Sequence, residues 1–166
     1  MFQPRVHKQG LMRDNRGYTL KFPEFSSDQS LGYSQILVSF NKEIGTFRGM
    51  HWQPETNKET KFIAVLHGKI LDFQVDMHSD SPSFGVVTEI EISDDGSVLE
   101  IPPLFAHGYL TLSSNTEILY GISGSYDSAS QRGFRWNDNA FDIKMPFNPK
   151  VISDRDSQFE DFGLNS

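Results

Sequence analysis

No cysteine occurs among the 166 residues of this chain. Its absence excludes a disulfide scaffold, a zinc site built on thiolates and a thiol nucleophile. The sequence also lacks any apolar run near the roughly 20 residues that a membrane-spanning helix needs. Residues 1–5 lack the apolar stretch of a signal peptide. We therefore expect a soluble protein of the cytoplasm with no membrane partner.

Positive charge is scarce relative to negative charge. Lys and Arg together number 15 against 22 Asp and Glu, which gives a formal net charge of -7. Nucleic acids and anionic membranes are bound by basic surfaces, so neither is an expected partner. A small anionic ligand stays compatible with this balance, because a few local arginines can oppose the global charge.

Helical periodicity is nearly absent, and short strand-like segments take its place. Aromatic residues make up 13% of the chain, 14 of them Phe, and such residues favour strands and bury large areas. Turn-forming residues separate apolar or alternating segments at 36–40, 61–66, 69–76, 86–92, 98–101, 108–112 and 117–122. Only residues 154–162 suit a short helix, with Ser153 as a possible N-cap. The pattern predicts one all-β domain over residues 1–166, a sandwich or barrel.

Two histidines stand out within glycine-containing segments. His51 follows Gly49 at an expected strand end, and His107 precedes Gly108. In a small β-barrel both side chains can point into the interior. We expect no metal, because only Glu55 or Glu59 would complete the ligand set and both are weak candidates. A structural histidine held by hydrogen bonds would show the same local sequence as His51.

Charged and phenolic residues near these histidines could complete a catalytic set. Arg48 and Lys61 flank His51 in the sequence, and two cations beside an imidazole suit an anionic substrate or an enolate. Tyr120 lies in an apolar strand, where a core role is the common one. Asp156 lies at the start of the expected helix, where solvent exposure is common. Together these residues could supply a base, an acid, an orienting carboxylate and cations.

The order of segments along the chain resembles the dTDP-4-dehydrorhamnose 3,5-epimerases. The matching pieces follow one register over nearly the whole sequence: 16–18, 47–53, Lys61, 68–76, 81–85, 101–108, Tyr120, Tyr126, 132–138 and 152–156. The resemblance implies a jelly-roll β-sandwich or barrel of the cupin type. It also implies a homodimer that acts on a nucleotide-sugar with neither a metal nor an organic cofactor.

The resemblance further implies roles for individual residues. In a 4-keto-6-deoxy sugar, the protons on carbons 3 and 5 flank the carbonyl, so their removal gives an enolate. His51 would be the base, Asp156 its orienting partner, Tyr120 the acid at carbon 5, and Lys61 the cation near the keto oxygen. Substrate contacts would come from Arg16, Arg48, Gln53, His107, Tyr126, Gln131 and Arg155. The Arg16 contact would reach the pocket of the partner subunit, and Tyr126 is the rival acid.

Some positions depart from the family pattern. Residues 36–38 read Ile-Leu-Val in place of Gln-x-Asn, while Lys21 and Gln131 stand where acidic residues are usual. The sugar could therefore be carried on a nucleotide other than dTDP. The alternatives are a single-carbon epimerase, a sugar 3,4-ketoisomerase, a metal-dependent cupin and a non-catalytic sugar-nucleotide-binding relative. Tyr120 argues against a strict carbon 3 enzyme, and the intact acid–base set argues against the non-catalytic relative.

Overall fold

The computed structural model describes residues 3–8, 11–14, 17–20, 33–124 and 128–163, and for residues 11–14, 17–20 and 57 it describes the backbone alone. These residues form twelve strands: β1 (Arg5–Lys8), β2 (Leu11–Asp14), β3 (Gly17–Leu20), β4 (Tyr33–Asn41), β5 (Phe47–Trp52), β6 (Glu59–His67), β7 (Lys69–Asp76), β8 (Val87–Ser93), β9 (Ser97–Ile101), β10 (Phe105–Thr111), β11 (Thr116–Gly124) and β12 (Arg132–Gly133). A 3₁₀ turn, η1 (Glu55–Asn57), and one helix, α1 (Asp154–Ser157), complete the set. None of the helices in the described part is long and apolar enough to cross a membrane.

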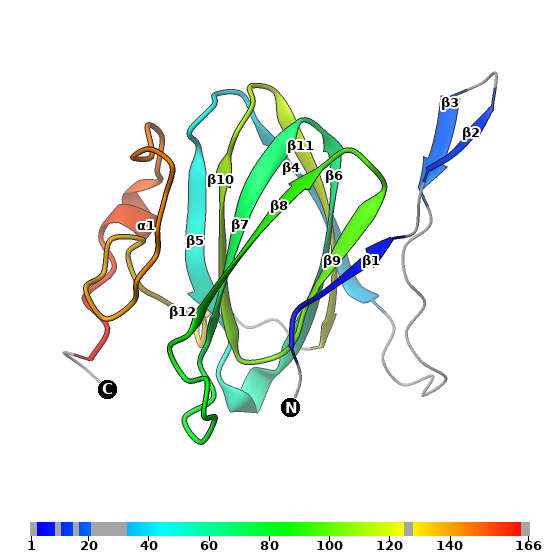
Figure 1. The fold of residues 1–166 in the computed structure, drawn as a ribbon. Coiled ribbons are helices and arrows are strands. Elements are labelled where there is room, and N and C mark those ends of the chain that lie inside the picture. Colours follow the sequence, from blue (N-terminus) through cyan, green and yellow to red (C-terminus); the bar gives the residue numbers. More distant parts are fainter. Residues whose placement is uncertain (1–2, 9–10, 15–16, 21–32, 125–127, 164–166) are drawn as a thin grey trace.

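The strands build two antiparallel sheets that curve around a common interior (Figure 1). The first has the order β1-β9-β6-β11-β4 and the second the order β12-β5-β10-β7-β8. The pair β2–β3 forms a separate hairpin that stands apart from the barrel (Figure 1). The predicted all-β, two-sheet fold is confirmed. All seven predicted strands are present as β4 and β6–β11, with shifts of a few residues at their ends. Only the end of β5 at His51 was predicted, and β1, β2, β3 and β12 were not.

The interior between the sheets is apolar at one end and polar at the other. Strand β6 shows the change, because alternate residues of a strand face the same side. Its inward-facing Val65 and Ile63 are buried in an apolar cluster, and the next inward residues toward its start are Lys61 and Glu59. The apolar end packs the two sheets together, and the polar end provides the side chains of a candidate site.

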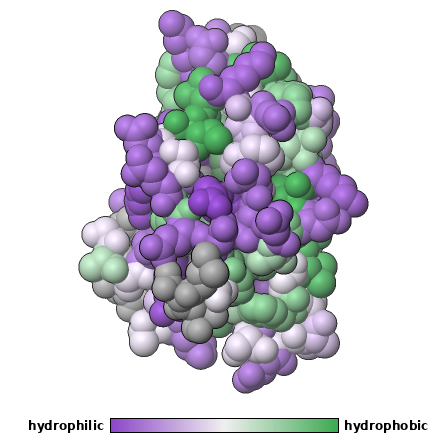
Figure 2. Space-filling model, turned by 90° about the vertical axis from the view of Figure 1, so that its left-hand side faces the viewer, coloured by the Kyte–Doolittle hydropathy of each residue, from purple (hydrophilic) through white to green (hydrophobic). Residues whose placement is uncertain are grey.

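The C-terminal segment covers the outer face of the second sheet. Phe134 and Phe141 stack with their ring centroids 4.3 Å apart and pack with Phe73 of β7 and Leu110 of β10 in one buried cluster. The face on which this segment lies is largely hydrophilic, with smaller hydrophobic patches (Figure 2). This packing brings α1 next to β5 (Figure 1).

The predicted C-terminal helix is present only as one turn. Ser153 caps it as predicted: the backbone N–H of Asp156 donates to Ser153 Oγ at 3.1 Å. The prediction was wrong beyond Ser157, where the chain leaves the helix and the Phe159 ring packs against Gly133 and His51. Tertiary packing of Phe159 thus outweighs the local helical pattern.

Candidate active site

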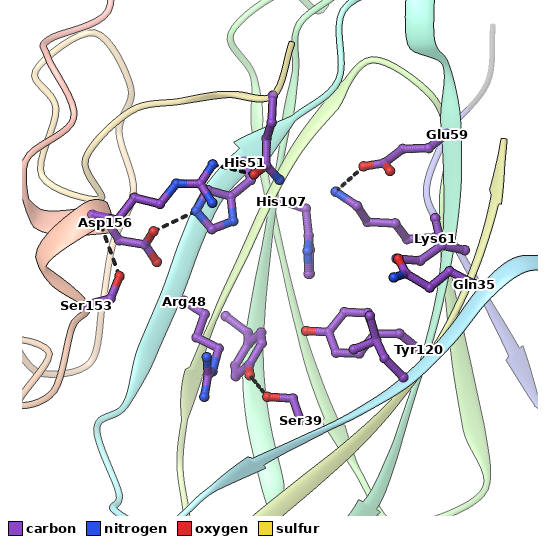
Figure 3. A pocket seen from close by; sticks show the side chains of 15 residues that line it. Gln35, Ser39, Arg48, His51, Glu59, Lys61, His107, Tyr120, Ser153 and Asp156 are labelled. Carbon is purple, nitrogen blue, oxygen red and sulfur yellow. Dashed lines mark hydrogen bonds and ion pairs between the residues drawn. The ribbon is translucent and has the colours of Figure 1, made fainter. Parts of the chain in front are cut away.

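A cavity of about 430 Å³ lies at the polar end of the barrel interior. Its walls come from both sheets and from the segment around α1 (Figure 3). The lining residues are Gln35, Leu37, Ser39, Arg48, His51, Glu59, Lys61, His107, Tyr109, Tyr120, Ile122, Gln131, Ser153, Arg155 and Asp156. Eight of the eleven predicted site residues therefore line this cavity or its rim; Gln53 does not, and Arg16 and Tyr126 lie outside the described residues.

A bulge in β5 turns both Arg48 and His51 toward the cavity. Residues three apart on a regular strand face opposite sides. Here His107 of β10 pairs with His51, and Tyr109 pairs with Arg48, so β5 advances three residues while β10 advances two. The extra residue restores the inward direction of the second side chain.

Two glycines allow the strands to approach closely at this bulge. A Cβ on Gly49 would lie 2.5 Å from Gly108 Cα, and Gly49 has a φ of +138°. A Cβ on Gly108 would lie 2.9 Å from the Arg48 carbonyl oxygen. A side chain at either position would push β5 away from β10. This close approach explains why each histidine segment contains a glycine.

His51 and Asp156 form a hydrogen-bonded dyad across 105 positions of sequence. His51 Nε2 lies 2.8 Å from Asp156 Oδ1, and the Gly49 N–H donates to Asp156 Oδ2 at 3.1 Å. An ionised carboxylate can only accept, so Nε2 carries the proton and Nδ1 is the basic nitrogen of the neutral ring. The Phe159 ring packs edge-on against the imidazole, with 5.7 Å between centroids. These contacts fix the tautomer and the orientation of His51.

The surroundings of Asp156 keep its carboxylate charged. Burial acts to raise its pKa, but the hydrogen bond and charge of His51 together with the Gly49 N–H outweigh burial and hold the pKa below its ordinary value. Because the folded-state pKa is lowered, the dyad stabilises the fold above the usual titration range of Asp, and this stabilisation is lost as the pH falls from that range through the lowered pKa.

Lys61 and Tyr120 occupy the wall opposite His51 (Figure 3). Lys61 Nζ lies 2.9 Å from Glu59 Oε1, and both side chains are nearly buried. Burial raises the pKa of Tyr120 well above its ordinary value, and the nearby Tyr109 and Asp72 act in the same direction. The Tyr120 phenol is therefore protonated at neutral pH and can donate a proton.

A second histidine–aspartate pair, which the sequence did not reveal, lies behind the cavity. His107 Nε2 is 2.7 Å from Asp72 Oδ2, and the Asp72 side chain is fully buried. The Gln74 amide donates to the other Asp72 oxygen. Asp72 and Gln74 sit in the predicted strand 69–76, where their alternation with apolar residues is the pattern of a solvent-facing side. Asp72 thus fixes the ring of His107, which faces Tyr120 with 6.4 Å between centroids.

Tyr109 is a cavity residue that sequence reasoning missed. Its hydroxyl donates to Asn41 Oδ1 at 3.2 Å and lies 3.1 Å from Ser39 Oγ. The same Asn41 oxygen accepts from Arg48 Nε at 2.9 Å. Asn41 therefore links the side chains of Arg48 and Tyr109 through one shared acceptor oxygen.

The remaining predicted contacts have mixed outcomes. The Arg155 guanidinium donates to Gln131 Oε1 at the rim. Gln53 does not line the cavity: it is 2% exposed, and its Oε1 accepts from Ser130 Oγ at 2.9 Å. It therefore stabilises the neighbouring segment and is not placed to contact a ligand, which corrects the prediction. Arg16 and Tyr126 lie outside the described residues, as does Lys21.

The weak metal-ligand candidates are not brought together. Glu55 is largely exposed and pairs with Lys58 at 2.8 Å, while Glu59 pairs with Lys61. Within the described ranges, no group of three His, Asp or Glu side chains could hold a metal ion.

The sequence is similar to that of known proteins over nearly its whole length. A sequence model of the family described as dTDP-4-dehydrorhamnose 3,5-epimerase matches residues 4–163. The chain belongs to this family. It is 29% identical to the dTDP-4-dehydrorhamnose 3,5-epimerase of Shigella flexneri over 98% of this chain and 90% of that protein. It is 35% identical to the Sinorhizobium fredii enzyme of that name, over 76% of this chain and 66% of that protein.

Solved structures of the family share the fold. The Bacillus anthracis dTDP-4-dehydrorhamnose 3,5-epimerase, solved with TDP and PPi bound, superposes with a TM-score of 0.86 at 29% identity, over 95% of this chain and 93% of that chain. A 3'-monoepimerase from Streptomyces bikiniensis, in complex with dTDP-quinovose, has a TM-score of 0.81 at 22% identity, over 95% and 83%. The family confirms the predicted isomerase, an epimerase of a nucleotide-linked sugar, while the fold alone leaves the number of inverted carbons open.

Proposed function

We propose that this chain epimerises a dTDP-linked 4-keto-6-deoxy sugar at both carbons that flank the keto group. The observation that carries the proposal is the His51–Asp156 dyad, which faces Lys61 and Tyr120 across one cavity (Figure 3). The TDP bound by the Bacillus anthracis relative supports dTDP as the nucleotide.

Proton removal falls to His51. With Nε2–H donated to Asp156, Nδ1 takes the proton from carbon 3 or carbon 5, and the charged Asp156 stabilises the imidazolium that forms. A positioned base of this kind contributes about 10²–10⁴-fold to the rate.

The enolate that follows places negative charge on the keto oxygen. Lys61 supplies the positive charge on the cavity wall at that oxygen. A fixed donor or cation at a developing oxyanion contributes about 3 kcal/mol to lowering the barrier.

Inversion needs a proton returned from the face opposite the base. Tyr120 lies on the wall opposite His51, and its raised pKa keeps the phenol protonated. We therefore assign Tyr120 as the acid for carbon 5.

Solvent deuterium incorporation tests the proposed function. The chain, in D₂O, is given a panel of nucleotide-linked 4-keto-6-deoxy sugars that differ in the nucleotide. We expect deuterium at carbons 3 and 5 of the dTDP-linked sugar. Exchange at carbon 3 alone would indicate a monoepimerase, and no exchange with any member of the panel would contradict the proposal.

We also propose that two copies of the chain associate through β4. This strand lies at the edge of the first sheet, and its outward-facing Ile36, Val38 and Phe40 are 68%, 58% and 53% exposed. Exposed apolar edge strands are normally covered. Ile36 and Val38, which depart from the family pattern, thus lie on the outer face and not on the cavity wall. The Arg16 contact in the partner pocket stays a prediction.

A charge on this strip should weaken the dimer. Sedimentation should show two chains for the wild type, and Val38→Lys should raise the dissociation constant at least about tenfold, because burying an ammonium beside the apolar Ile36 and Phe40 is unfavourable. The control is Val86→Lys, which changes a 54% exposed valine just before β8. A monomeric wild type, or equal effects of the two substitutions, would reject the proposal.

A further inference from the structure

Glu59 is a buried carboxylate in the wall of a cavity that takes an anionic substrate. Its residue is 6% exposed, and it lies two positions before Lys61 on the same face of β6. Burying a carboxylate is unfavourable unless charges and hydrogen bonds compensate it. Lys61 supplies the charge, with Nζ at 2.9 Å from Oε1 (Figure 3).

Among the described residues, Lys61 is the one charged contact of the Glu59 carboxylate. Neither carboxylate oxygen accepts a directed hydrogen bond from any residue that the structure describes, so the Lys61 contact is an ion pair only. Buried polar atoms in native proteins are normally paired. An acceptor left over beside a catalytic lysine indicates that a ligand supplies the donor.

The charges that line the cavity indicate which part of the substrate lies beside Glu59. The other two cations that line the described cavity have neutral partners, since Arg48 donates to Asn41 and Arg155 to Gln131. Their positive charges stay available to phosphates. Glu59 places a negative charge beside the ammonium of Lys61, so this end of the cavity attracts a diphosphate less than the two arginines do and suits the sugar.

Side by side, Lys61 and Glu59 present one donor and one acceptor. A ketone with a hydroxyl on the next carbon presents the complementary acceptor and donor, also side by side. We propose that Glu59 is a specificity-determining residue: it accepts a hydrogen bond from the hydroxyl on the carbon next to the keto group, while Lys61 donates to the keto oxygen. This inference rests on the proposed function, which supplies the keto sugar.

The test compares two substrates that differ only in that hydroxyl. They are the dTDP-linked 4-keto-6-deoxy sugar and its 3-deoxy analogue, and kcat/KM is measured for deuterium exchange at carbon 5, which both contain. We expect the wild type to favour the hydroxylated sugar at least about tenfold, because the analogue leaves a buried charged acceptor unpaired. Glu59→Gln should lose most of this preference, since its neutral amide accepts more weakly. Glu59→Asp, which retains the charge, should retain part of it.

The matched control is Glu55→Gln, which removes an exposed carboxylate four residues earlier and should leave the preference unchanged. A wild type that is indifferent to the hydroxyl, or a preference that survives in folded Glu59→Gln, overturns the assignment of Glu59 and leaves the epimerase function standing. A wild type that exchanges neither substrate overturns both. If Glu59→Gln does not fold, Glu59→Asp decides the matter: an unchanged preference in that variant also overturns the assignment.

Discussion

His51→Asn is expected to abolish deuterium exchange at both carbon 3 and carbon 5, with a loss of about 10²–10⁴-fold or more in rate. One base serves both carbons because both flank the same ketone, so a single substitution should remove both exchanges together. The asparagine amide can still reach Asp156, but it has no nitrogen that can take a proton at neutral pH. The rate is measured by mass spectrometry or NMR of the sugar after incubation in D₂O.

The control for His51→Asn is His7→Asn, because His7 also pairs with a carboxylate, Glu100 at 2.6 Å, but lies outside the cavity. Asp156→Asn should keep substrate binding and slow exchange strongly, since the orienting charge is lost while the shape remains. Exchange at the wild-type rate in folded His51→Asn would show that another group is the base.

Tyr120→Phe is expected to retain exchange at carbon 3 and to lose net inversion at carbon 5, which leaves a singly epimerised product. The phenylalanine ring preserves the packing against His107, so the fold should remain stable. Only the proton donor on the wall opposite His51 is removed. The product is identified by its coupling constants in the NMR spectrum, and the loss at carbon 5 should be about 10²-fold or more.

Tyr109→Phe tests whether the other phenol in the cavity could be the acid in place of Tyr120. The Tyr109 hydroxyl is engaged by Asn41 and Ser39, so its removal should change the position of Arg48 and hence binding more than inversion. Tyr33→Phe, on the outer face of the first sheet, should change neither. If Tyr120→Phe forms the doubly inverted sugar at an unchanged rate, the acid is Tyr109 or Tyr126.

The sequence predicted seven of the strands and the strand end at His51, because alternation and glycine positions are local signals. The partner of His51 could be named only through the resemblance, since Asp156 lies 105 positions away and its own surroundings suggest an exposed helix start. Asp72 was missed for a related reason: a carboxylate in an alternating strand reads as solvent-facing, and only the closed barrel makes that side the inside.

The β5 bulge and the one-turn helix could not be predicted from local pattern. The inward direction of both Arg48 and His51 depends on how β5 pairs with β10, which is decided by the register of two strands far apart in sequence. Gln53 was expected at the ligand because it lies in the same segment as His51, but β5 ends at Trp52, and the Gln53 side chain beyond it is bound by Ser130.

The position of Asp156 beyond the last strand also has a consequence for when the enzyme becomes active. His51, the proposed base, is oriented by a residue of α1, and α1 is held in place by the C-terminal segment that packs on the second sheet. A growing chain emerges from the ribosome N-terminus first, so the barrel and His51 are synthesised well before Asp156. Under the proposed mechanism the imidazole gains its orienting partner only at the final stage of synthesis, so a chain that ends before α1 should exchange the sugar protons much more slowly.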